Sequence, residues 1–244
     1  MTTIRIPAGK TRMIAHRGLS GIEKENTNAS FVAAGNRSYW GIETDVHRTA
    51  DGRIVAIHDE NTERLTGRSL VIAETGFDTL RSIPLLGKDG SEGRIDQRIP
   101  TLEEYISICR TYEKVSVLEL KGNPDRETVR GILETVDRLG WLENTVFISF
   151  SYDSLTAVRS FLPGQPVQFL TKRPDDAVIS AIRRDRFDLD AYHRELTEEM
   201  IRTLHADGLQ VNCWTVNAPE DAQRLIGWGV DFISTNILEA EPAL

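Results

Sequence analysis

Cysteine is scarce in this sequence. The 244 residues include only Cys109 and Cys213, which lie far apart and lack the spacing of a metal-binding motif. Two isolated thiols of this kind favour a reducing compartment. The first eighteen residues also lack the apolar core of a secretory signal. We therefore expect a cytoplasmic protein.

Long apolar runs and a surplus of basic residues are missing as well. No run approaches the roughly 18 apolar residues of a membrane-spanning helix, so no span is expected. Lys and Arg number 29 against 37 Asp and Glu, which gives a net charge of -8 and a pI near 5.2. This balance argues against non-specific nucleic-acid binding, which depends on basic surface. It favours a metal cation as partner, or small substrates met by local positive groups.

What the chain does have is a repeated alternation of short apolar runs and helical patterns. The runs cover residues 12–16, 41–46, 115–121, 145–150, 166–171, 187–192, 209–216 and 230–236. Between them, segment 126–140 places apolar residues at helical spacing, and Thr197 and Pro219 mark helix starts. Eight strand–helix units in a chain of this length predict an α/β fold, a closed (β/α)8 TIM barrel. A doubly wound open sheet is the alternative, but no G-x-G-x-x-G follows the first run.

Two segments interrupt this repeat after the second strand. Residues 52–59 resemble a strand that returns antiparallel to 41–46 through a tight turn at 50–52. A parallel barrel has no place for such a partner, so we interpret it as an excursion above the rim. Segment 60–100 is irregular and too short for a domain, and we interpret it as an elaborated loop that roofs one side of the site. We therefore expect a single barrel domain over residues 1–244, with a short insertion after the second strand.

Acidic residues gather at the strand ends that form the mouth of such a barrel. Side chains two positions apart on a strand share a face, so Glu43 and Asp45 point the same way, as do Glu119 and Lys121 on the next strand. Three converging carboxylates repel one another, and burying them unpaired is costly. A hard divalent cation relieves this conflict, and oxygen ligands suit Mg²⁺ or Ca²⁺. The simpler alternative is that the acids form ion pairs with Lys121, Arg17 and other bases.

Two histidines are expected beside these acids. The return strand brings His58 back to the level of Asp45, and His16 ends the strand on the other side. Cleavage of a phosphodiester needs a base for the nucleophile and an acid for the leaving oxygen, and a histidine pair can share these roles. Arg17 or Lys121, together with a metal, would offset the charge of the phosphoryl oxygens.

The remaining titratable residues of this region receive weaker assignments. His193 and His205 are interpreted as structural, because one follows the sixth strand and the other lies within a helix. His47 shares the face of Glu43 and Asp45, and its role stays open. Asp59 is expected to orient its neighbour His58.

Taken together, these motifs resemble one known family. They are AHRG at 15–18, ENT at 25–27, GIETDV at 41–46, TADGRIVAIHD at 49–59, IPTLEE at 99–104, LELK at 118–121 and WTVN at 214–217. In this order and over nearly the whole chain, they resemble the glycerophosphodiester phosphodiesterases, relatives of the phosphatidylinositol phospholipase C barrels.

The resemblance implies a barrel that hydrolyses a small-molecule phosphodiester to glycerol 3-phosphate and an alcohol. By position, the family's metal ligands match Glu43, Asp45 and Glu119, and its acid/base histidines match His16 and His58. Its phosphate-binding cations match Arg17 and Lys121, and its aromatic wall matches Trp214. Mechanisms described for the family often pass through a cyclic phosphodiester formed by the glycerol hydroxyl and opened by water.

Three positions depart from the family pattern. Lys24 replaces a proline before the ENT element, which can change how that loop sits. Asn236 replaces an aspartate after the last strand, so a negative charge is lost there. His47 stands where glutamine is common, and it is given no catalytic role.

Three other functions remain as alternatives at this point. A lysophospholipase D-type relative would act on lipids and would need an apolar rim, for which 60–100 offers Leu70, Val71, Ile72 and Phe77. A metal-free glycoside hydrolase could use two acids such as Glu43 and Glu119, but it would not need two histidines. A catalytically silent phosphate-binding protein would have lost part of the expected set, and all of it is present. The pattern does not discriminate between Mg²⁺ and Ca²⁺, between head-group alcohols, or between oligomeric states.

Overall fold

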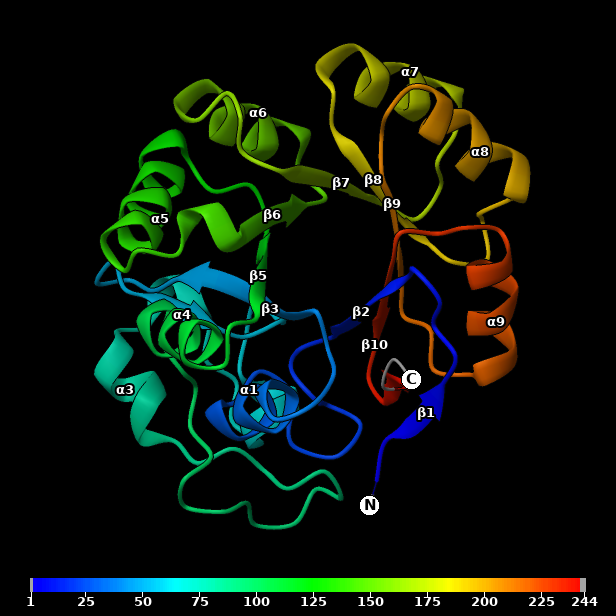
Figure 1. Ribbon diagram of the computed structural model, residues 1–244. Helices are drawn as coiled ribbons and strands as arrows, with labels where there is room; N and C mark the ends of the chain where they lie inside the picture. Colours follow the sequence, from blue (N-terminus) through cyan, green and yellow to red (C-terminus); the bar gives the residue numbers. More distant parts are fainter. Residues whose placement is uncertain (1, 242–244) are drawn as a thin grey trace.

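Eight parallel strands form a closed barrel in the computed structural model, which describes residues 2–241. The barrel strands are β2 (Arg12–Ala15), β3 (Gly41–Arg48), β5 (Val115–Leu120), β6 (Thr145–Ser149), β7 (Val167–Thr171), β8 (Asp188–Tyr192), β9 (Val211–Trp214) and β10 (Phe232–Thr235). They follow the order β2-β10-β9-β8-β7-β6-β5-β3, and pairing of β2 with β3 closes the ring (Figure 1). The predicted TIM barrel is confirmed, with each predicted run lying on one of its strands.

Helices surround the barrel in Figure 1. They are α1 (Asn28–Gly35), α4 (Leu102–Thr111), α5 (Arg126–Arg138), α6 (Tyr152–Phe161), α7 (Asp176–Asp185), α8 (Glu198–Ala206) and α9 (Pro219–Gly227). Side chains of small polar residues cap most of them: Thr197, as predicted, accepts a hydrogen bond from the backbone N–H of Met200 at the start of α8. Such caps accept hydrogen bonds from backbone N–H groups that have no partner within the helix. The start of each capped helix is therefore determined by residues close to it in the sequence.

The last strand is not followed by an eighth helix within the described residues. Instead, β11 (Leu238–Ala240) turns back and pairs in parallel with β1 (Ile4–Ile6). The side chain of Glu239 anchors this small sheet, because its Oε1 accepts hydrogen bonds from the backbone N–H and the hydroxyl of Ser38, both at 3.1 Å. These two strands were not predicted, because three-residue runs are too short to stand out from loops.

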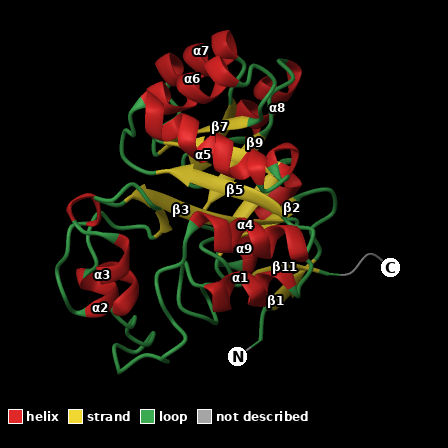
Figure 2. Cartoon of the chain, turned by 90° about the vertical axis from the view of Figure 1, so that its left-hand side faces the viewer, coloured by secondary structure: helices red, strands yellow, loops and turns green. Residues whose placement is uncertain are grey.

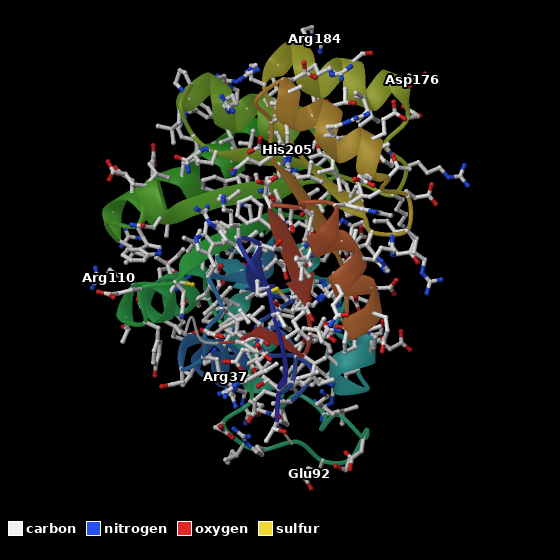
Figure 3. The ribbon with its side chains drawn as sticks, turned by 45° about the vertical axis from the view of Figure 1, so that its right-hand side comes forward. Arg37, Glu92, Arg110, Asp176, Arg184 and His205 are labelled. Carbon is white, nitrogen blue, oxygen red and sulfur yellow. The ribbon has the colours of Figure 1, made fainter. Side chains whose placement is uncertain are left out.

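Apolar side chains fill two layers. The larger core lies between the outer face of the barrel and the helices. A smaller cluster fills the barrel interior and includes Ile14, Val117, Ile148, Leu170 and Phe232. Charged helix residues such as Arg110, Asp176 and Arg184 point away from the barrel (Figure 3). Burial of each large aliphatic side chain contributes about 1.5–3 kcal/mol, so the interior cluster holds the strand ends in fixed positions beneath the mouth.

The predicted insertion after the second barrel strand is confirmed. Strand β4 (Ile54–Ala56) runs antiparallel to β3, with Val46 opposite Ala56. The chain then forms α2 (Glu63–Thr66), the short 3-10 helix η1 (Ile72–Glu74) and α3 (Phe77–Ser82), which lie beside the barrel in Figure 2. Segment 60–100 is thus more ordered than the loop predicted for it.

A small apolar core of its own holds this insertion together. Its buried members are Val55, Ile57, Leu65, Ile72, Leu80, Leu85 and Ile99, and the partly buried Leu70 and Phe77 pack against them. The core explains why so short a segment keeps a defined shape beside the barrel mouth. Over residues 2–241, none of the helices is both long and apolar enough to cross a bilayer.

Candidate active site

Three buried carboxylates meet at the mouth of the barrel. Glu43 and Asp45 project from β3 and Glu119 from β5, where Asp45 and Glu119 are paired across the two strands. Their exposed fractions are 2%, 1% and 7%, and one carboxylate oxygen from each lies within 4.8 Å of the others. The predicted convergence of these acids is therefore confirmed.

Two cations share the charge of the three acids. Lys121 Nζ lies 2.9 Å from Glu119 Oε1 and 3.5 Å from Asp45 Oδ1, and Arg17 Nε lies 3.5 Å from Asp45 Oδ2. The ion pairs proposed as the alternative to a metal are thus present as well. When all three acids are ionised, these cations compensate two charges of three, so a proton or a further cation is needed to neutralise the third.

The pKa values of the acids differ because of this uneven pairing. Burial, with Asp45 and Glu119 nearby, raises the pKa of Glu43 well above its ordinary value. Burial and the charge of Asp45 raise the pKa of Glu119 to about 8 against the opposing effect of Lys121. Burial also acts on Asp45, but Arg17 and Lys121 outweigh it and hold the pKa of Asp45 below its ordinary range. An all-oxygen donor set with this unmet charge suits a hard divalent cation.

The turn after β2 places the phosphate-binding candidate Arg17. Its backbone adopts a positive φ of 55°, and its N–H donates a hydrogen bond to Glu43 Oε2 at 2.7 Å. Gly18 follows at φ 72°, where a Cβ would come within 2.3 Å of Ser30 Oγ, so only glycine fits. The AHRG motif is therefore a tight turn that fixes Arg17 beside the acids.

The ENT segment supports the same cluster, a role that the sequence analysis did not assign. Glu25 Oε1 accepts a hydrogen bond from Arg17 Nη1 at 2.9 Å. Asn26 donates through Nδ2 to Asp45 Oδ2 at 2.8 Å and accepts through Oδ1 from Thr44 at 2.7 Å. Thr27 caps α1. The motif was visible in the sequence, but nothing in its spacing indicates these contacts.

His16 ends β2 with one ring nitrogen already engaged. Nδ1 lies 2.8 Å from Asn236 Oδ1, an acceptor, so Nδ1 carries the proton and Nε2 is left free. Asn236 Oδ1 also accepts a hydrogen bond from the Ser20 hydroxyl at 2.9 Å. Burial, and then the charge of Arg17, lower the pKa of His16 to about 4, which keeps the ring neutral. The departure from aspartate noted at Asn236 thus falls on the direct partner of His16.

His58 reaches the site from the insertion. The N–H of Ile57 binds the carbonyl of Asp45 at 3.0 Å, so the next residue lies beside the acid, as the hairpin predicted. His58 Nδ1 lies 2.6 Å from Asp59 Oδ1, and Arg64 Nε donates to Asp59 Oδ2 at 2.6 Å. His47 Nε2 lies 3.1 Å from the His58 carbonyl oxygen, so His47 holds the backbone of His58. The expectation that Asp59 orients His58 agrees with this contact.

A cavity of ≈ 60 Å³ brings most of the candidates together. Its lining includes His16, Arg17, Glu43, His58, Glu119 and Trp214. Asp45 and Lys121 do not line it, but Lys121 forms ion pairs with both Asp45 and Glu119, and Glu119 lines the cavity. Phe150 stands against Trp214 with the ring centroids 5.7 Å apart, and these two rings form an aromatic wall.

Asp190 is a buried acid in this cavity that the sequence analysis missed. It projects from β8, is 1% exposed, and its Oδ1 has no hydrogen-bond partner among residues 2–241. Burial, with the charge of Glu119, raises the pKa of Asp190 well above its ordinary value. An aspartate within a strand carries no local signal that distinguishes an inward acid from an exposed one.

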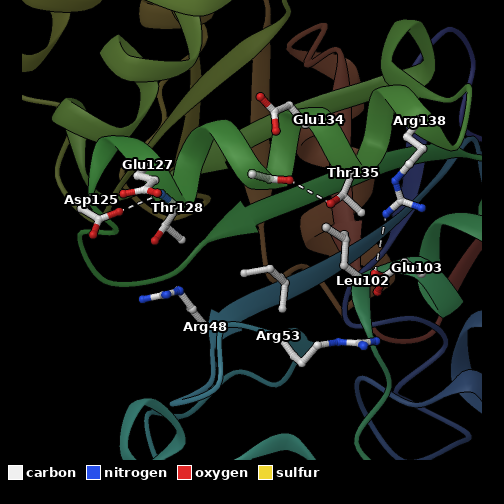
Figure 4. A pocket seen from close by; sticks show the side chains of 13 residues that line it. Arg48, Arg53, Leu102, Glu103, Asp125, Glu127, Thr128, Glu134, Thr135 and Arg138 are labelled. Carbon is white, nitrogen blue, oxygen red and sulfur yellow. Dashed lines mark hydrogen bonds and ion pairs between the residues drawn. The ribbon is translucent and has the colours of Figure 1, made fainter.

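Other polar groups lie outside the site. A groove of ≈ 600 Å³ runs between the β3–β4 hairpin and α5, with Arg48 on the side of Asp125 and Glu127 and Arg53 on the side of Leu102 and Glu103 (Figure 4). None of the eight candidate residues lines it. His205 binds Asp231 at 2.8 Å on the helical layer, in agreement with its structural assignment.

The fold and the site together define a TIM-barrel enzyme with an acidic centre, two histidines and two cations at its mouth. A family model described as the glycerophosphoryl diester phosphodiesterase family matches residues 16–240. The chain belongs to this family and is a phosphodiesterase, which confirms the resemblance found in the sequence.

Individual relatives extend over nearly the same length. The Bacillus subtilis (strain 168) protein YhdW is 33% identical over 92% of this chain and 93% of its own. A glycerophosphodiester phosphodiesterase of Caldanaerobacter subterraneus subsp. tengcongensis is 29% identical over 93% and 94%. Among solved structures, the Oleispira antarctica phosphodiesterase OLEI02445, in complex with the product sn-glycerol-3-phosphate, superimposes with a TM-score of 0.82 at 25% identity over 92% of both chains.

Proposed function

We propose that this phosphodiesterase hydrolyses glycerophosphodiesters to glycerol 3-phosphate and an alcohol, and that it depends on a divalent cation. The observation that carries the proposal is the meeting of three buried acids and two histidines, one from the barrel and one from the insertion, around a single cavity. The bound product in the Oleispira antarctica relative supports glycerol 3-phosphate as the product class.

Glu43, Asp45 and Glu119 are the residues that would hold the cation, with Mg²⁺ and Ca²⁺ both suited to three carboxylates. A bound divalent ion supplies positive charge to the phosphoryl oxygens. Arg17 and Lys121 supply further positive charge at the same place, since both are already within 3.5 Å of Asp45. The chain therefore prepares an environment in which a phosphodiester is stabilised as negative charge develops.

The two histidines divide the proton transfers. His16 is neutral with Nε2 free, so it serves as the base that takes the proton of the attacking hydroxyl. His58 holds Asp59 through Nδ1, which leaves Nε2 to deliver a proton to the leaving oxygen of the alcohol. The carboxylate of Asp59 holds the ring in this orientation. The attacking hydroxyl is that of the glycerol moiety, so its oxygen bonds to phosphorus as the bond to the leaving alcohol breaks, which gives a cyclic phosphodiester. Water then opens this ring: His58 takes the proton of the water and His16 returns its proton to the glycerol oxygen, so one water is consumed and each histidine returns to its starting state.

Trp214 is proposed to contact the substrate. With Phe150 it offers an apolar surface on one side of the cavity, opposite the charged groups of β3 and β5. A wall of this kind fits the carbon backbone of the glycerol moiety while the phosphate faces Arg17 and Lys121.

The lipid-directed alternative receives less support from the insertion. Ile72 is buried, and Leu70 and Phe77 pack against the small core, so of the four apolar residues only Val71, at 43% exposure, faces solvent. A glycoside hydrolase uses two carboxyl groups, so its mechanism would give no role to Arg17, Lys121 or the two histidines. We therefore retain a small glycerophosphodiester as the substrate.

Two further expectations belong to this proposal. We propose that residues 1–244 act as one barrel domain, since the insertion packs through β4 onto β3. We also propose a cytoplasmic location, in which Cys109 and Cys213, both buried and unpaired, would remain thiols.

The test is an assay of released glycerol 3-phosphate on a panel of glycerophosphodiesters, with EDTA and with added Mg²⁺ or Ca²⁺. We expect hydrolysis that EDTA abolishes and that one of the two ions restores. Undiminished hydrolysis in EDTA would refute the metal requirement. Activity on a glycosidic substrate that survives changes at both histidines would refute the phosphodiester assignment.

A further inference from the structure

A second pocket lies on the rim of the barrel mouth, and none of the eight candidate residues lines it. It encloses ≈ 260 Å³ between the loop after β2 and the loop around residues 86–90 of the insertion. Lys24, Glu25, Arg64 and Lys88 supply its charged side chains. We call it the rim pocket.

Positive charge dominates the rim pocket in a chain whose net charge is -8. Three cations face one carboxylate, and that carboxylate is fully engaged: both oxygens of Glu25 accept hydrogen bonds from Arg64 at 2.8 Å. Lys24 is half-buried, and its side chain has no ion-pair or hydrogen-bond partner within residues 2–241. The pKa of Lys24 is lowered by burial and, despite Glu25, by the charges of Arg64 and Lys88, so these cations lie close enough to repel one another.

The two lysines are the least engaged cations of the pocket. Arg64 uses three of its five N–H groups on the carboxylates of Asp59 and Glu25, so its charge is already met by ion pairs. Lys88 makes one hydrogen bond, to the carbonyl oxygen of Ser20, and keeps further N–H groups. Unmet positive charge at a partly buried lysine is unfavourable until an anion binds.

Short contacts connect the rim pocket to the active site on the side of His58. Glu25 Oε1 is shared by Arg64 at 2.8 Å and Arg17 at 2.9 Å. Through Asp59, Arg64 also reaches the ring of His58. The aromatic wall of Phe150 and Trp214 is built from other strands, β6 and β9, and shares no residue with this pocket. The rim pocket is therefore connected to the active site through Glu25, Asp59 and Arg64, on the side of His58.

We propose that the rim pocket binds a phosphate monoester carried by the leaving alcohol, so that the enzyme favours glycerophosphodiesters with a phosphorylated head group. This inference rests on the proposed function, in which His58 protonates the leaving oxygen. A phosphate monoester carries nearly two negative charges at neutral pH, so it matches two ammonium groups that form no ion pair better than a single carboxylate does. Lys24, which stands in place of the proline usual in this family, contributes one of the two.

The test compares two substrates that differ in one group. These are glycerophosphopropanediol and the same compound phosphorylated on its terminal hydroxyl. We expect the wild-type kcat/KM to favour the phosphorylated substrate by about tenfold, and the double variant Lys24→Ala/Lys88→Ala to lose this preference. Lys24→Arg/Lys88→Arg should keep most of it. Lys172→Ala is the matched control, since this exposed lysine follows β7 on the same face of the barrel and lies outside the pocket.

Direct binding of propanediol phosphate, measured by calorimetry on the wild type and the double variant, separates this inference from the proposed function. Binding that the double variant loses supports the rim pocket even where neither diester is hydrolysed, an outcome that would refute the proposed function alone. Three results would overturn the rim pocket: equal kcat/KM for both substrates in the wild type, a preference that survives in a folded double variant, or an equal loss in Lys172→Ala. Thermal unfolding of each variant establishes that it is folded.

Discussion

His16 donates a hydrogen bond through Nδ1 to the side chain of Asn236, at 2.8 Å, across the junction of β2 and β10. The partner is uncharged, so it fixes the tautomer of the ring and favours the imidazolium less than a carboxylate would. Burial, and then the charge of Arg17, outweigh this contact and lower the pKa of His16 to about 4, so the ring is neutral over the physiological range.

Replacing Asn236 with aspartate should raise the pKa of His16. A carboxylate 2.8 Å from Nδ1 favours the charged ring, so its pKa moves from about 4 towards the ordinary value of 6.5. The acidic limb of the kcat/KM profile then moves to higher pH, because His16 is protonated and inactive as a base over a wider range. NMR titration of the ring in metal-free protein measures the shift directly. An unchanged His16 titration contradicts the prediction.

His58→Ala should lower kcat by about 10²–10⁴-fold, the usual contribution of a general acid or base. Asp59→Asn should cause a smaller loss, because it removes the charge that supports the ring but leaves the ring in place. Steady-state kinetics on a glycerophosphodiester provide both values. His205→Ala serves as the control, and a His58→Ala enzyme with undiminished turnover would remove this residue from the mechanism.

Metal affinity should rise with pH. In the metal-free fold the pKa of Glu119 is about 8, above its unfolded value of 4.5, so the folded state binds the extra proton and loses stability as the pH rises through this window. A divalent cation replaces that proton. We expect Mg²⁺ to raise the thermal midpoint more at pH 8.5 than at pH 6, and calorimetry in two buffers to detect proton release on binding.

Glu119→Gln provides the control for this pH effect. It removes the titrating group, so binding should become weaker and lose much of its pH dependence. Equal affinity of the wild type at the two pH values is the result that contradicts the expected linkage.

The insertion should be sensitive to its own small core. Leu80→Ala removes a fully buried side chain from that core, which costs about 2–5 kcal/mol of unfolding free energy at such positions. Ile95→Ala, at a residue that is 85% exposed in the same segment, should change stability by less than about 0.5 kcal/mol. Denaturant unfolding and limited proteolysis of 60–100 measure both effects. Equal stability of the two variants would show that the apolar cluster does not hold the insertion.

The barrel could be predicted because its signals are local. Strand runs such as 115–121 are rich in apolar residues, since the strands are buried on both faces, and the helix starts carry capping residues such as Thr197. The pairing of β1 with β11 could not be predicted in this way. Ile4 and Leu238 meet only because the barrel has brought distant segments together.

The residues of the candidate site also fall into two groups, those that a local sequence pattern predicts and those that depend on contacts between distant segments. Alternation on a strand was enough to place Glu43 and Asp45 on one face, and the register with β5 brought Glu119 to them. The roles of Asn26 and Asn236 depend on side-chain contacts between loops, which no spacing rule describes. Asp190 was missed for the same reason, since a pattern along one strand does not show that its carboxyl points into the cavity at the barrel mouth.

The closure of the barrel between β2 and β10 also affects the order in which the protein folds during synthesis. During synthesis β2 emerges early, but its second neighbour β10 follows some 220 residues later, the separation of His16 and Asn236. Closing so long a loop costs chain entropy before any stabilising contact between the two strands can form. We therefore expect this junction to be among the last parts of the fold to form. The ring of His16 acquires its fixed tautomer at that same step. A nascent chain can therefore gather Glu43, Asp45 and Glu119 from its first half, but it gains an oriented base only when the barrel is complete.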